Sequence, residues 1–550
     1  MLSLGACRRP ATESQTARVD KLFAAWNRTD SPGCAVGVSR NGAIIYQHGY
    51  GMANLELGVP ITPATVFPIA SITKSFTAMS VLLAVDQGKL SLDDEVQKYI
   101  PDWTDRDDHI TVRHLITHTS GVRDAFALLG WAPAESTGDV NESIVKMLAR
   151  QRGLNFAPGS EYQYNNGGYN LLATILKRAT GQSLGRFAEA NIFKPLGMTQ
   201  THVHDDVAML VPNRASGYTR DVRGWRAARQ DGGVVGNDGM YSTVGDLLQW
   251  EDNFDSQRVG RPETLASMQK PMALHGGAVA HGLGFGLGEY RGVPTVSGSG
   301  GDYGIATEVA RFPAQHFSVA VLCNEDNIVM GGKARLNPDV FINGIADIYL
   351  ADVLKPIDVA APPPISAPSA PAVKLTDAEL SEKIGLYRIG GVDFPVRMTV
   401  AHGVLMGRSL FGDGFDLELA PKSPNQFLLY NSVPFEFVPA AAGKAKAWRV
   451  GVGKDQRIWE LVTFAPPAAE VLAFAGDYHS DELNVTFTVE PKGSSLNVAH
   501  TVDAAPYEKD VFVGDWVGIM RFTRDGRGAV SGFTLNRANA KGVRFDKVSK

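Results

Sequence analysis

The tetrad Ser71-Ile72-Thr73-Lys74 supplies a nucleophile and a base three residues apart. It opens an apolar stretch that follows Phe67-Pro68 and predicts a helix running to about Gln87. Because three residues is slightly less than one helical turn, Ser71 and Lys74 would lie on one face within hydrogen-bonding reach. Burial among apolar side chains would lower the pKa of Lys74, and a neutral lysine can take the serine proton. The helix start would also place backbone N–H groups where an oxyanion forms. The tetrad therefore indicates acyl transfer through a serine ester.

The same spacing occurs twice more, at Ser143 with Lys146 and at Ser267 with Lys270. Both copies resemble amphipathic surface turns whose lysine points into water, and we expect no chemistry there. Spacing alone is therefore weak evidence, and residues elsewhere must distinguish the first copy.

Tyr164-Asn165-Asn166 provides that distinction, because it is the only Y-x-N sequence among 15 tyrosines. A phenol beside the Ser71 hydroxyl can relay a proton between nucleophile, base and leaving group. The Asn166 amide can hold both Lys74 and a substrate carbonyl.

These motifs, together with His118-Thr119-Ser120-Gly121 between them, resemble the serine beta-lactamase-related hydrolases of the class C and penicillin-binding type. The resemblance covers roughly residues 17–350. It implies an α+β fold in which the site lies between an antiparallel sheet and a helical lobe. It also implies that Ser71 is acylated, Lys74 is the general base, Tyr164 relays protons and Asn166 contacts the substrate.

The third motif of such enzymes, Lys-Thr-Gly or His-x-Gly on a strand, is altered here. The corresponding segment reads Val296-Ser297-Gly298-Ser299-Gly300-Gly301-Asp302, with Ser299 or Gly298 in place of the cationic or imidazole residue. We expect Ser299, Gly300 and Gly301 to contact the substrate, Gly300 by keeping the backbone close to it. By resemblance, a backbone N–H near Gly301 or Asp302 would be the second oxyanion donor. The missing charge disfavours tight recognition of a substrate carboxylate.

Composition excludes several classes of protein. The chain has 550 residues, 44% of them hydrophobic and 20% charged, and a net charge of −5. It has no basic stretch with interleaved aromatics, which argues against a nucleic-acid partner, and no apolar run long enough to cross a bilayer. His202-Val203-His204-Asp205-Asp206 contains metal-ligand types but sits in a loop-like setting, and His114 and His118 lack the glutamate of a metalloprotease motif. We expect neither a metal nor another cofactor.

The three cysteines are too few for a disulfide framework. Cys34 and Cys323 lie in apolar strand-like runs, so we expect buried thiols. Leu4-Gly5-Ala6-Cys7 looks like the end of a lipoprotein signal, but only six residues precede Cys7. Either the true start lies upstream or the match is accidental, so a cytoplasmic and a periplasmic location both stay open.

Composition also divides the chain. Residues 1–16 form an N-terminal tail and 17–355 the hydrolase domain, in which Asn41-Gly42 is expected to turn a hairpin within residues 34–48. The proline-rich segment 356–374 is a semi-rigid linker. Residues 375–465 and 466–550 alternate apolar and polar residues between glycine turns, which predicts two small antiparallel, lipocalin-like β-barrels. A faint repeat, Gly385-Leu386-Tyr387 and Gly476-Asp477-Tyr478, would open the two copies.

This layout resembles the three-domain D-stereospecific aminopeptidases, where a loop from the barrels helps close the site. The resemblance implies small peptide, amide or ester substrates with a free amino terminus. Their ammonium group needs a carboxylate, for which Asp302 and the pair Asp481-Glu482 are candidates. The alternatives are an esterase or penicillin-recognising hydrolase and, in another class, a non-catalytic peptidoglycan-fragment sensor. A homodimer also stays open.

Overall fold

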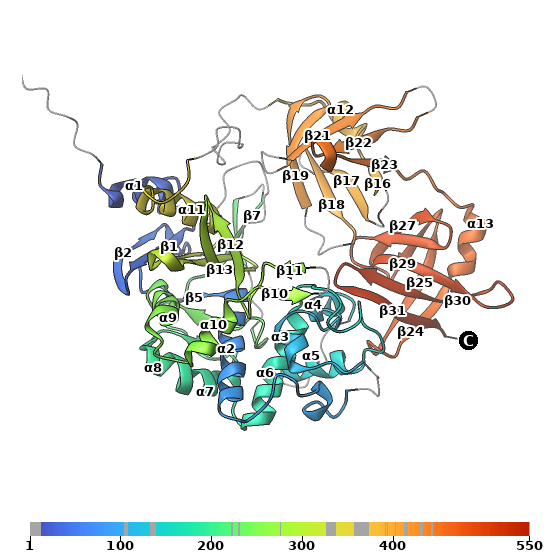
Figure 1. Ribbon diagram of the computed structural model, residues 1–550. Helices are drawn as coiled ribbons and strands as arrows, with labels where there is room; N and C mark the ends of the chain where they lie inside the picture. Colours follow the sequence, from blue (N-terminus) through green and yellow to red (C-terminus); the bar gives the residue numbers. More distant parts are fainter. Residues whose placement is uncertain are drawn as a thin grey trace, which may run out of the picture.

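The computed structural model describes residues 13–103, 108–132, 139–221, 224–228, 232–274, 277–325, 337–356 and 373–548, except 391, 393, 402, 412–415, 430–432 and 442–443. The chain forms an α+β unit followed by two closed antiparallel barrels (Figure 1). This confirms the predicted fold class. Most of the predicted linker, residues 357–372, and Cys7 in the predicted tail lie outside the described residues.

A six-stranded antiparallel sheet, in the order β12-β13-β14-β15-β1-β2, organises the α+β unit. The first two strands form the predicted hairpin, in which Asn41 and Gly42 both have positive φ, at 52° and 73°. The strands far apart in sequence meet where β15 pairs with β1. The bounds are β1 Cys34–Arg40, β2 Ala43–Tyr50, β12 Gly286–Tyr290, β13 Val293–Asp302, β14 Ile305–Phe312 and β15 Phe317–Cys323.

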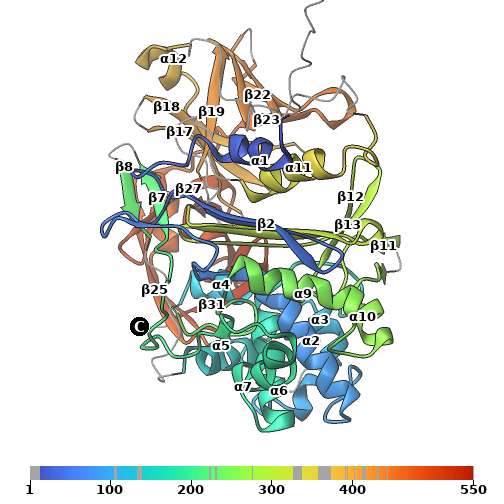
Figure 2. The same cartoon turned by 90° about the vertical axis from the view of Figure 1, so that its left-hand side faces the viewer.

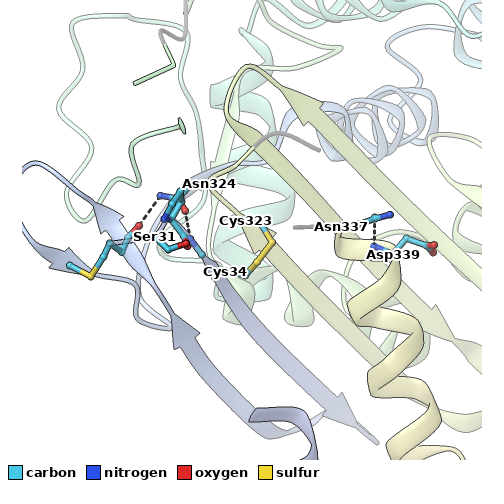
Figure 3. The surroundings of a disulfide bond; sticks show 9 residues. Ser31, Cys34, Cys323, Asn324, Asn337 and Asp339 are labelled. Carbon is cyan, nitrogen blue, oxygen red and sulfur yellow. Dashed lines mark hydrogen bonds between the residues drawn. A yellow bond between two sulfur atoms is a disulfide. The ribbon is translucent and has the colours of Figure 1, made fainter. Parts of the chain in front are cut away.

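The expectation of free thiols at Cys34 and Cys323 is wrong. The two residues stand directly opposite each other in the β1–β15 register, with Cα atoms 4.1 Å apart, and form a disulfide (Figure 3). A count of cysteines could not reveal this bond, because it depends on which strands are neighbours and in which register. The bond joins positions 289 residues apart and cross-links these two neighbouring strands at one end.

Helices cover both faces of the sheet (Figure 2). On one face, α1 (Gln15–Phe23) packs against α11 (Pro338–Tyr349) over a compact apolar cluster. On the other face, α9 (Val244–Ser256) lies on β15 and β1, and α2 (Thr73–Asp86) leads into the helical lobe. The other helices of this unit are α3 Val112–Ile116, α4 Ala125–Leu129, α5 Val140–Ala149, α6 Asn166–Thr180, α7 Leu184–Ala188, α8 Lys194–Leu196 and α10 Pro262–Met268.

Short strand pairs connect these layers. The pairing of β5 with β9 matters for the site, because β5 ends three residues before Ser71 and so helps to position it. The short strands are β3 Met52–Asn54, β4 Val59–Pro60, β5 Phe67–Pro68, β6 His202–Val203, β7 Tyr218–Asp221, β8 Gly224–Ala227, β9 Met240–Ser242, β10 Met272–Leu274 and β11 Gly277–Val279.

Each barrel has eight strands and closes by pairing its first strand with its last. The first barrel comprises β16 Gly385–Ile389, β17 Pro395–Ala401, β18 Val404–Ser409, β19 Asp416–Ser423, β20 Gln426–Leu429, β21 Val433–Val438, β22 Ala447–Val450 and β23 Arg457–Leu461, preceded by α12 Asp377–Ser381. The second comprises β24 Gly476–Ser480, β25 Val485–Lys492, β26 Ser495–Val498, β27 Val502–Glu508, β28 Val511–Gly514, β29 Gly518–Arg524, β30 Val530–Arg537 and β31 Ala540–Lys547, preceded by α13 Ala468–Val471. The Gly-x-Tyr repeat opens both barrels.

Within the described ranges, no helix combines the length and the apolar character that crossing a bilayer requires.

The expectation that the second S-x-x-K copy is a surface turn is wrong at Ser143, which is buried inside α5 and donates its hydroxyl proton to the Asp139 carbonyl. The segment resembles an amphipathic surface turn in sequence, but it forms helix α5, which packs against α6.

Candidate active site

Ser71 lies where a short strand runs into a long helix. Pro68 on β5 pairs with Tyr241 on β9, and the Ile69 N–H donates to the Met240 carbonyl. A single 3₁₀ turn, Ala70–Ile72, then leads into α2, so the α-helix begins two residues later than Ser71. Ala70 has a positive φ of 45°, which marks the sharp change of direction at this junction. The nucleophile candidate is thus held on a rigid corner at the amino end of a helix.

Lys74 is buried one turn further on, and its ammonium Nζ has three oxygen neighbours, each at 2.9 Å. They are the Ser71 hydroxyl, the Asn166 side-chain carbonyl and the Asn237 backbone carbonyl. Burial lowers the pKa of Lys74 to about 7, while the nearby carboxylates of Asp238 and Asp124 oppose that fall. Near neutral pH a substantial fraction of this lysine is uncharged. In that state two N–H bonds reach the carbonyls and the lone pair faces the Ser71 hydroxyl.

Tyr164 approaches Ser71 from the other side, and its hydroxyl donates to Ser71 Oγ at 2.8 Å. Its ring covers Lys74 Nζ at 4.8 Å and lies against the His118 ring, with centroids 4.7 Å apart. The backbone N–H of Asn165 donates to His118 Nδ1 at 3.1 Å, which fixes this segment. Burial raises the pKa of Tyr164 well above its usual range, so the phenol keeps its proton in the resting site.

Asn166 is the first residue of α6, and Asn165 caps that helix by accepting from the Gly168 N–H. The Asn166 backbone N–H donates to Asp124 Oδ2 at 2.6 Å, while its side chain accepts from Lys74. The structure therefore brings Ser71, Lys74, Tyr164 and Asn166 into one hydrogen-bonded group.

A pocket of about 440 Å³ opens over this group. One wall is β13, whose pairing with β12 ends at Ser297, so residues 299–301 extend beyond the last β12 pair. Ser299, Gly300 and Gly301 all line the pocket, as do Ser71, Lys74 and Tyr164. An extended backbone of this kind can pair with a substrate amide.

The two glycines of this wall differ in what surrounds them. A Cβ on Gly300 would stand 2.4 Å from the Ile69 carbonyl oxygen, whereas one on Gly301 would meet nothing within 4 Å. We expected Gly300 to keep the backbone close to the substrate. Its close neighbour in the structure is the backbone that leads into Ser71, so it seats β13 against the nucleophile turn, and its approach to a substrate stays a prediction.

Two further residues of the pocket, His281 and Glu308, carry chemistry that the sequence motifs did not indicate. His281 donates its Nδ1 proton to the Gly282 carbonyl if the hydrogen lies there, at 2.7 Å, and its ring lies 5.5 Å from that of Tyr162. Glu308 pairs with Ser299 across β13 and β14, and burial raises its pKa to about 8. A lone carboxylate in the apolar run Ile305–Phe312 is a signal that could have identified Glu308, whereas nothing in the sequence distinguishes His281.

The carboxylates proposed from sequence lie elsewhere. Asp302 is exposed at the β13–β14 turn. Glu482 is buried in an ion pair with Arg123, and Asp481 contacts Arg152 at 3.0 Å. Asp481 and Glu482 thus join the second barrel to the helical lobe, and neither lines the pocket.

Of the histidine-rich segment, His202 and Val203 form the short strand β6, and His204-Asp205-Asp206 follow in the loop expected from sequence. His202 and His204 pack around Tyr241, with centroids 5.5 and 4.8 Å from it. Over the described residues, no three side chains of the metal-ligand types His, Cys, Asp and Glu come together in a way that could hold a metal ion.

The fold and the hydrogen-bonded serine and lysine define a serine hydrolase. The chain belongs to the beta-lactamase family, whose profile matches residues 19–336. It is 26% identical over 529 residues to a D-aminopeptidase of Brucella melitensis biotype 1, covering 94% of this chain and 96% of that protein. A D-aminopeptidase of Brucella anthropi is 32% identical over 273 residues, covering 49% of this chain and 51% of the relative.

Solved structures agree with the fold. The octameric penicillin-binding protein homologue from Pyrococcus abyssi superposes with a TM-score of 0.56 at 21% identity, covering 81% of this chain and all of that chain, 100%. A penicillin-binding protein from Bacillus halodurans gives 0.50 at 23% identity, covering 62% of this chain and 100% of its own.

Proposed function

We propose that this hydrolase is a D-stereospecific aminopeptidase that releases amino-terminal D-residues from short peptides, amides or esters. The observation that carries the chemistry is the convergence of Lys74 and Tyr164 on one oxygen, Ser71 Oγ. Relatives named D-aminopeptidase that match along nearly the whole chain support the substrate class.

The hydrogen bonds support one order of events. Neutral Lys74 accepts the Ser71 proton as Oγ bonds to the substrate carbonyl carbon, and the new oxyanion receives N–H groups from Ser71 and from β13 near Gly301. Tyr164 passes the proton from Lys74 to the departing amine as the C–N bond breaks. Water then attacks the ester, the acid leaves, and Ser71 regains its proton.

The lining of the pocket supports a substrate with a free amino group. Ser299 supplies no positive charge where a carboxylate-binding enzyme has a cation, and Glu308 supplies a carboxyl group to the same pocket. An ammonium ion would stabilise the charged form of Glu308, since an opposite charge lowers the pKa of a carboxyl group. The preference for D-residues is supported by the relatives alone.

Turnover of matched D- and L-aminoacyl anilides by wild type and Ser71→Ala tests the proposal. We expect hydrolysis of the D-series only, and a loss of about 10⁴-fold or more in kcat for Ser71→Ala, because no other group takes over a missing nucleophile. Equal rates for wild type and variant would refute the mechanism. Equal rates for both enantiomers would refute the specificity while leaving the mechanism intact.

The pH profile tests the base. The pKa of Lys74 is lowered to about 7, so the lysine is charged below that value and cannot accept a proton. We therefore expect kcat/KM to fall about tenfold per pH unit below pH 7 and to level off above it. A flat profile between pH 5 and 9, roughly the range over which such a base must titrate, would exclude Lys74 as the base.

An esterase is the second candidate, favoured by the uncharged Ser299 wall. Parallel assays with short acyl esters and a cephalosporin separate the two, because only an aminopeptidase requires the substrate amino group. A non-catalytic peptidoglycan sensor would bind fragments without forming a covalent adduct, so intact-mass detection of Ser71 phosphonylation by a fluorophosphonate would exclude it.

A further inference from the structure

Asp124 is a buried carboxylate that sits behind the active-site group. Only 2% of its surface is exposed, and it follows His118-Thr119-Ser120-Gly121 at the start of α4. It is not one of the residues that line the pocket. A substrate in the pocket would therefore not touch it, so any effect on the reaction must pass through another residue.

The carboxylate of Asp124 is shared between two helices. Oδ1 caps α4 by accepting from the N–H groups of Phe126 and Ala127, and Oδ2 accepts from the Asn166 N–H at 2.6 Å. Asn166 in turn accepts from Lys74 Nζ. One continuous path of hydrogen bonds thus leads from Asp124 to the lysine that faces Ser71.

The second barrel contacts the backbone of Asp124 on the side away from the active site. The turn between β30 and β31 and the first two residues of β31, together residues 538–541 and called the 538–541 turn below, present their backbone to the loops of the helical lobe. The Asn539 carbonyl accepts from the Asp124 N–H at 2.7 Å and from Asn155 Nδ2 at 2.9 Å. Asn155 Oδ1 also accepts from the Lys541 N–H at 2.9 Å.

Two more side chains bind the same turn. Gln163, one residue before Tyr164, donates to the Ala538 carbonyl at 3.0 Å, and Arg123 donates to the Lys541 carbonyl at 2.8 Å. The 538–541 turn therefore binds one residue that follows the His118–Gly121 motif, Arg123, and one that precedes the Tyr164–Asn166 motif, Gln163.

We propose that Asp124 is a positioning residue that orients Asn166, and through it Lys74, and that the 538–541 turn of the second barrel fixes Asp124 in place. The proposal rests on the proposed function only in assuming that Lys74 is the base.

Asp124 also acts on Lys74 by charge, because its carboxylate raises the pKa of the lysine against the effect of burial. Other groups share that environment. Asp238 raises the same pKa, and the imidazoles of His118 and His281 interact with the lysine charge. The rings of Tyr164 and Tyr169 cover its Nζ at 4.8 and 5.8 Å. Removal of the Asp124 charge therefore leaves an environment that favours neutral lysine.

These two roles give Asp124→Asn a distinctive signature. Loss of the second carboxylate oxygen displaces Asn166, so we expect the maximal acylation rate to fall about 10- to 100-fold. Loss of the charge lowers the pKa of Lys74. The acid limb, which is the part of the pH profile where the rate falls as the pH decreases, should therefore move to lower pH. KM for a substrate should stay within about twofold, because Asp124 does not contact the substrate and the substitution removes no binding interaction. A merely structural role would lower the rate equally at all pH values.

Asp124→Glu is the matched variant, because it keeps the charge while moving the carboxylate. We expect it to lose rate without shifting the acid limb. Asn155→Ala tests the barrel turn, since it removes the contacts with Asn539 and Lys541. It also removes the hydrogen bond that Asn155 Nδ2 donates to Gln163 Oε1 at 2.8 Å, but no hydrogen bond of Lys74, Asn166 or the Asp124 carboxylate. Asn155→Ala should lower the acylation rate about tenfold and leave the acid limb of the pH profile at the wild-type position. Arg152→Ala, an exposed neighbour on the same interface, is its control and should stay within about twofold.

The experiment is the pH dependence of Ser71 modification by a fluorophosphonate, in which Oγ bonds to phosphorus and fluoride leaves. This rate stands for the acylation rate, because the same hydroxyl attacks and the same base takes its proton. The reaction is followed by intact mass, with thermal melting to establish that each variant is folded. If wild type is not modified, the proposed function fails. If wild type is modified with an acid limb and Asp124→Asn shows the same limb and rate, the positioning role is overturned. If Asn155→Ala is modified at the wild-type rate, the part assigned to the barrel is overturned.

Discussion

The two barrels share a design but differ in what they touch. Each opens with a Gly-x-Tyr sequence whose glycine lies against the last strand, where a Cβ would meet Leu461 Cδ1 at 2.7 Å or Lys547 Cε at 2.8 Å. Each tyrosine, Tyr387 or Tyr478, is fully buried and donates to the carbonyl four residues earlier, at 3.0 or 2.8 Å. The repeat thus specifies how a barrel begins and closes.

The contacts of the two barrels show the difference. The first barrel has its own apolar core, whereas most buried apolar residues of the second belong to the same cluster as the helical lobe. A smaller apolar cluster joins the two barrels, with Leu410 of the first against Tyr507 and Val511 of the second. The first barrel contacts the second through Arg388, which donates to the Tyr507 carbonyl, and through Arg397, which pairs with Asp515 at 2.8 Å. The same fold is thus a peripheral module in one copy and part of the catalytic unit in the other.

The largest expected effect is at Arg123. Its guanidinium and the Glu482 carboxylate are 3% and 6% exposed, so Arg123→Ala leaves a buried charge without its partner. We expect a loss of about 3–5 kcal/mol in the free energy of unfolding, measured by denaturant titration. Arg397→Ala at the interface between the barrels is the control, because that ion pair is partly exposed, and should cost about 0–1 kcal/mol. Equal losses would mean that the two interfaces are equivalent.

A smaller effect is expected at Gly518 on β29. Its φ is 75°, and a Cβ there would stand 2.5 Å from the carbonyl oxygen of Asn536, just before the 538–541 turn. Gly518→Ala should cost about 2–3 kcal/mol, the upper part of the range for a strained backbone. Gly493→Ala has a similar φ of 62° with nothing within 4 Å, and should cost about 1 kcal/mol. If the thermal melts of the two variants coincide, the close approach to Asn536 carries no energy.

A smaller effect again, equal in both barrels, is expected from the repeated tyrosines. Tyr387→Phe and Tyr478→Phe each remove one buried hydrogen bond and keep the ring. Each should cost about 1 kcal/mol in unfolding free energy, measured by denaturant titration of the full chain. A cost confined to one barrel would show that the repeat has lost its shared function.

The sequence predicted what depends on local pattern and missed what depends on neighbours across the fold. Two barrels followed from alternation and a repeated Gly-x-Tyr, and the grouping of Ser71 with Tyr164 followed from the order of motifs. The Cys34–Cys323 bond was missed because it requires the β1–β15 register. Asp124 was missed because it belongs to no motif, and only the packing of α4 against α6 gives it a neighbour with chemistry. Glu308 was missed although it is a lone carboxylate in an apolar strand, because only the pairing of β14 with β13 places that strand beside the pocket.

The smallest effect is expected at Arg152, which lies on the same interface as Arg123. Its side chain is 68% exposed and pairs with Asp481, itself 62% exposed, so water screens the attraction. The Arg152 backbone N–H, which donates to Glu482 at 3.0 Å, survives truncation of the side chain. Arg152→Ala should therefore change the unfolding free energy by less than about 1 kcal/mol, and by still less in 1 M salt, where a charge is screened within about 3 Å. A loss comparable to that of Arg123→Ala would show that the interface depends on its total charge rather than on the one buried pair.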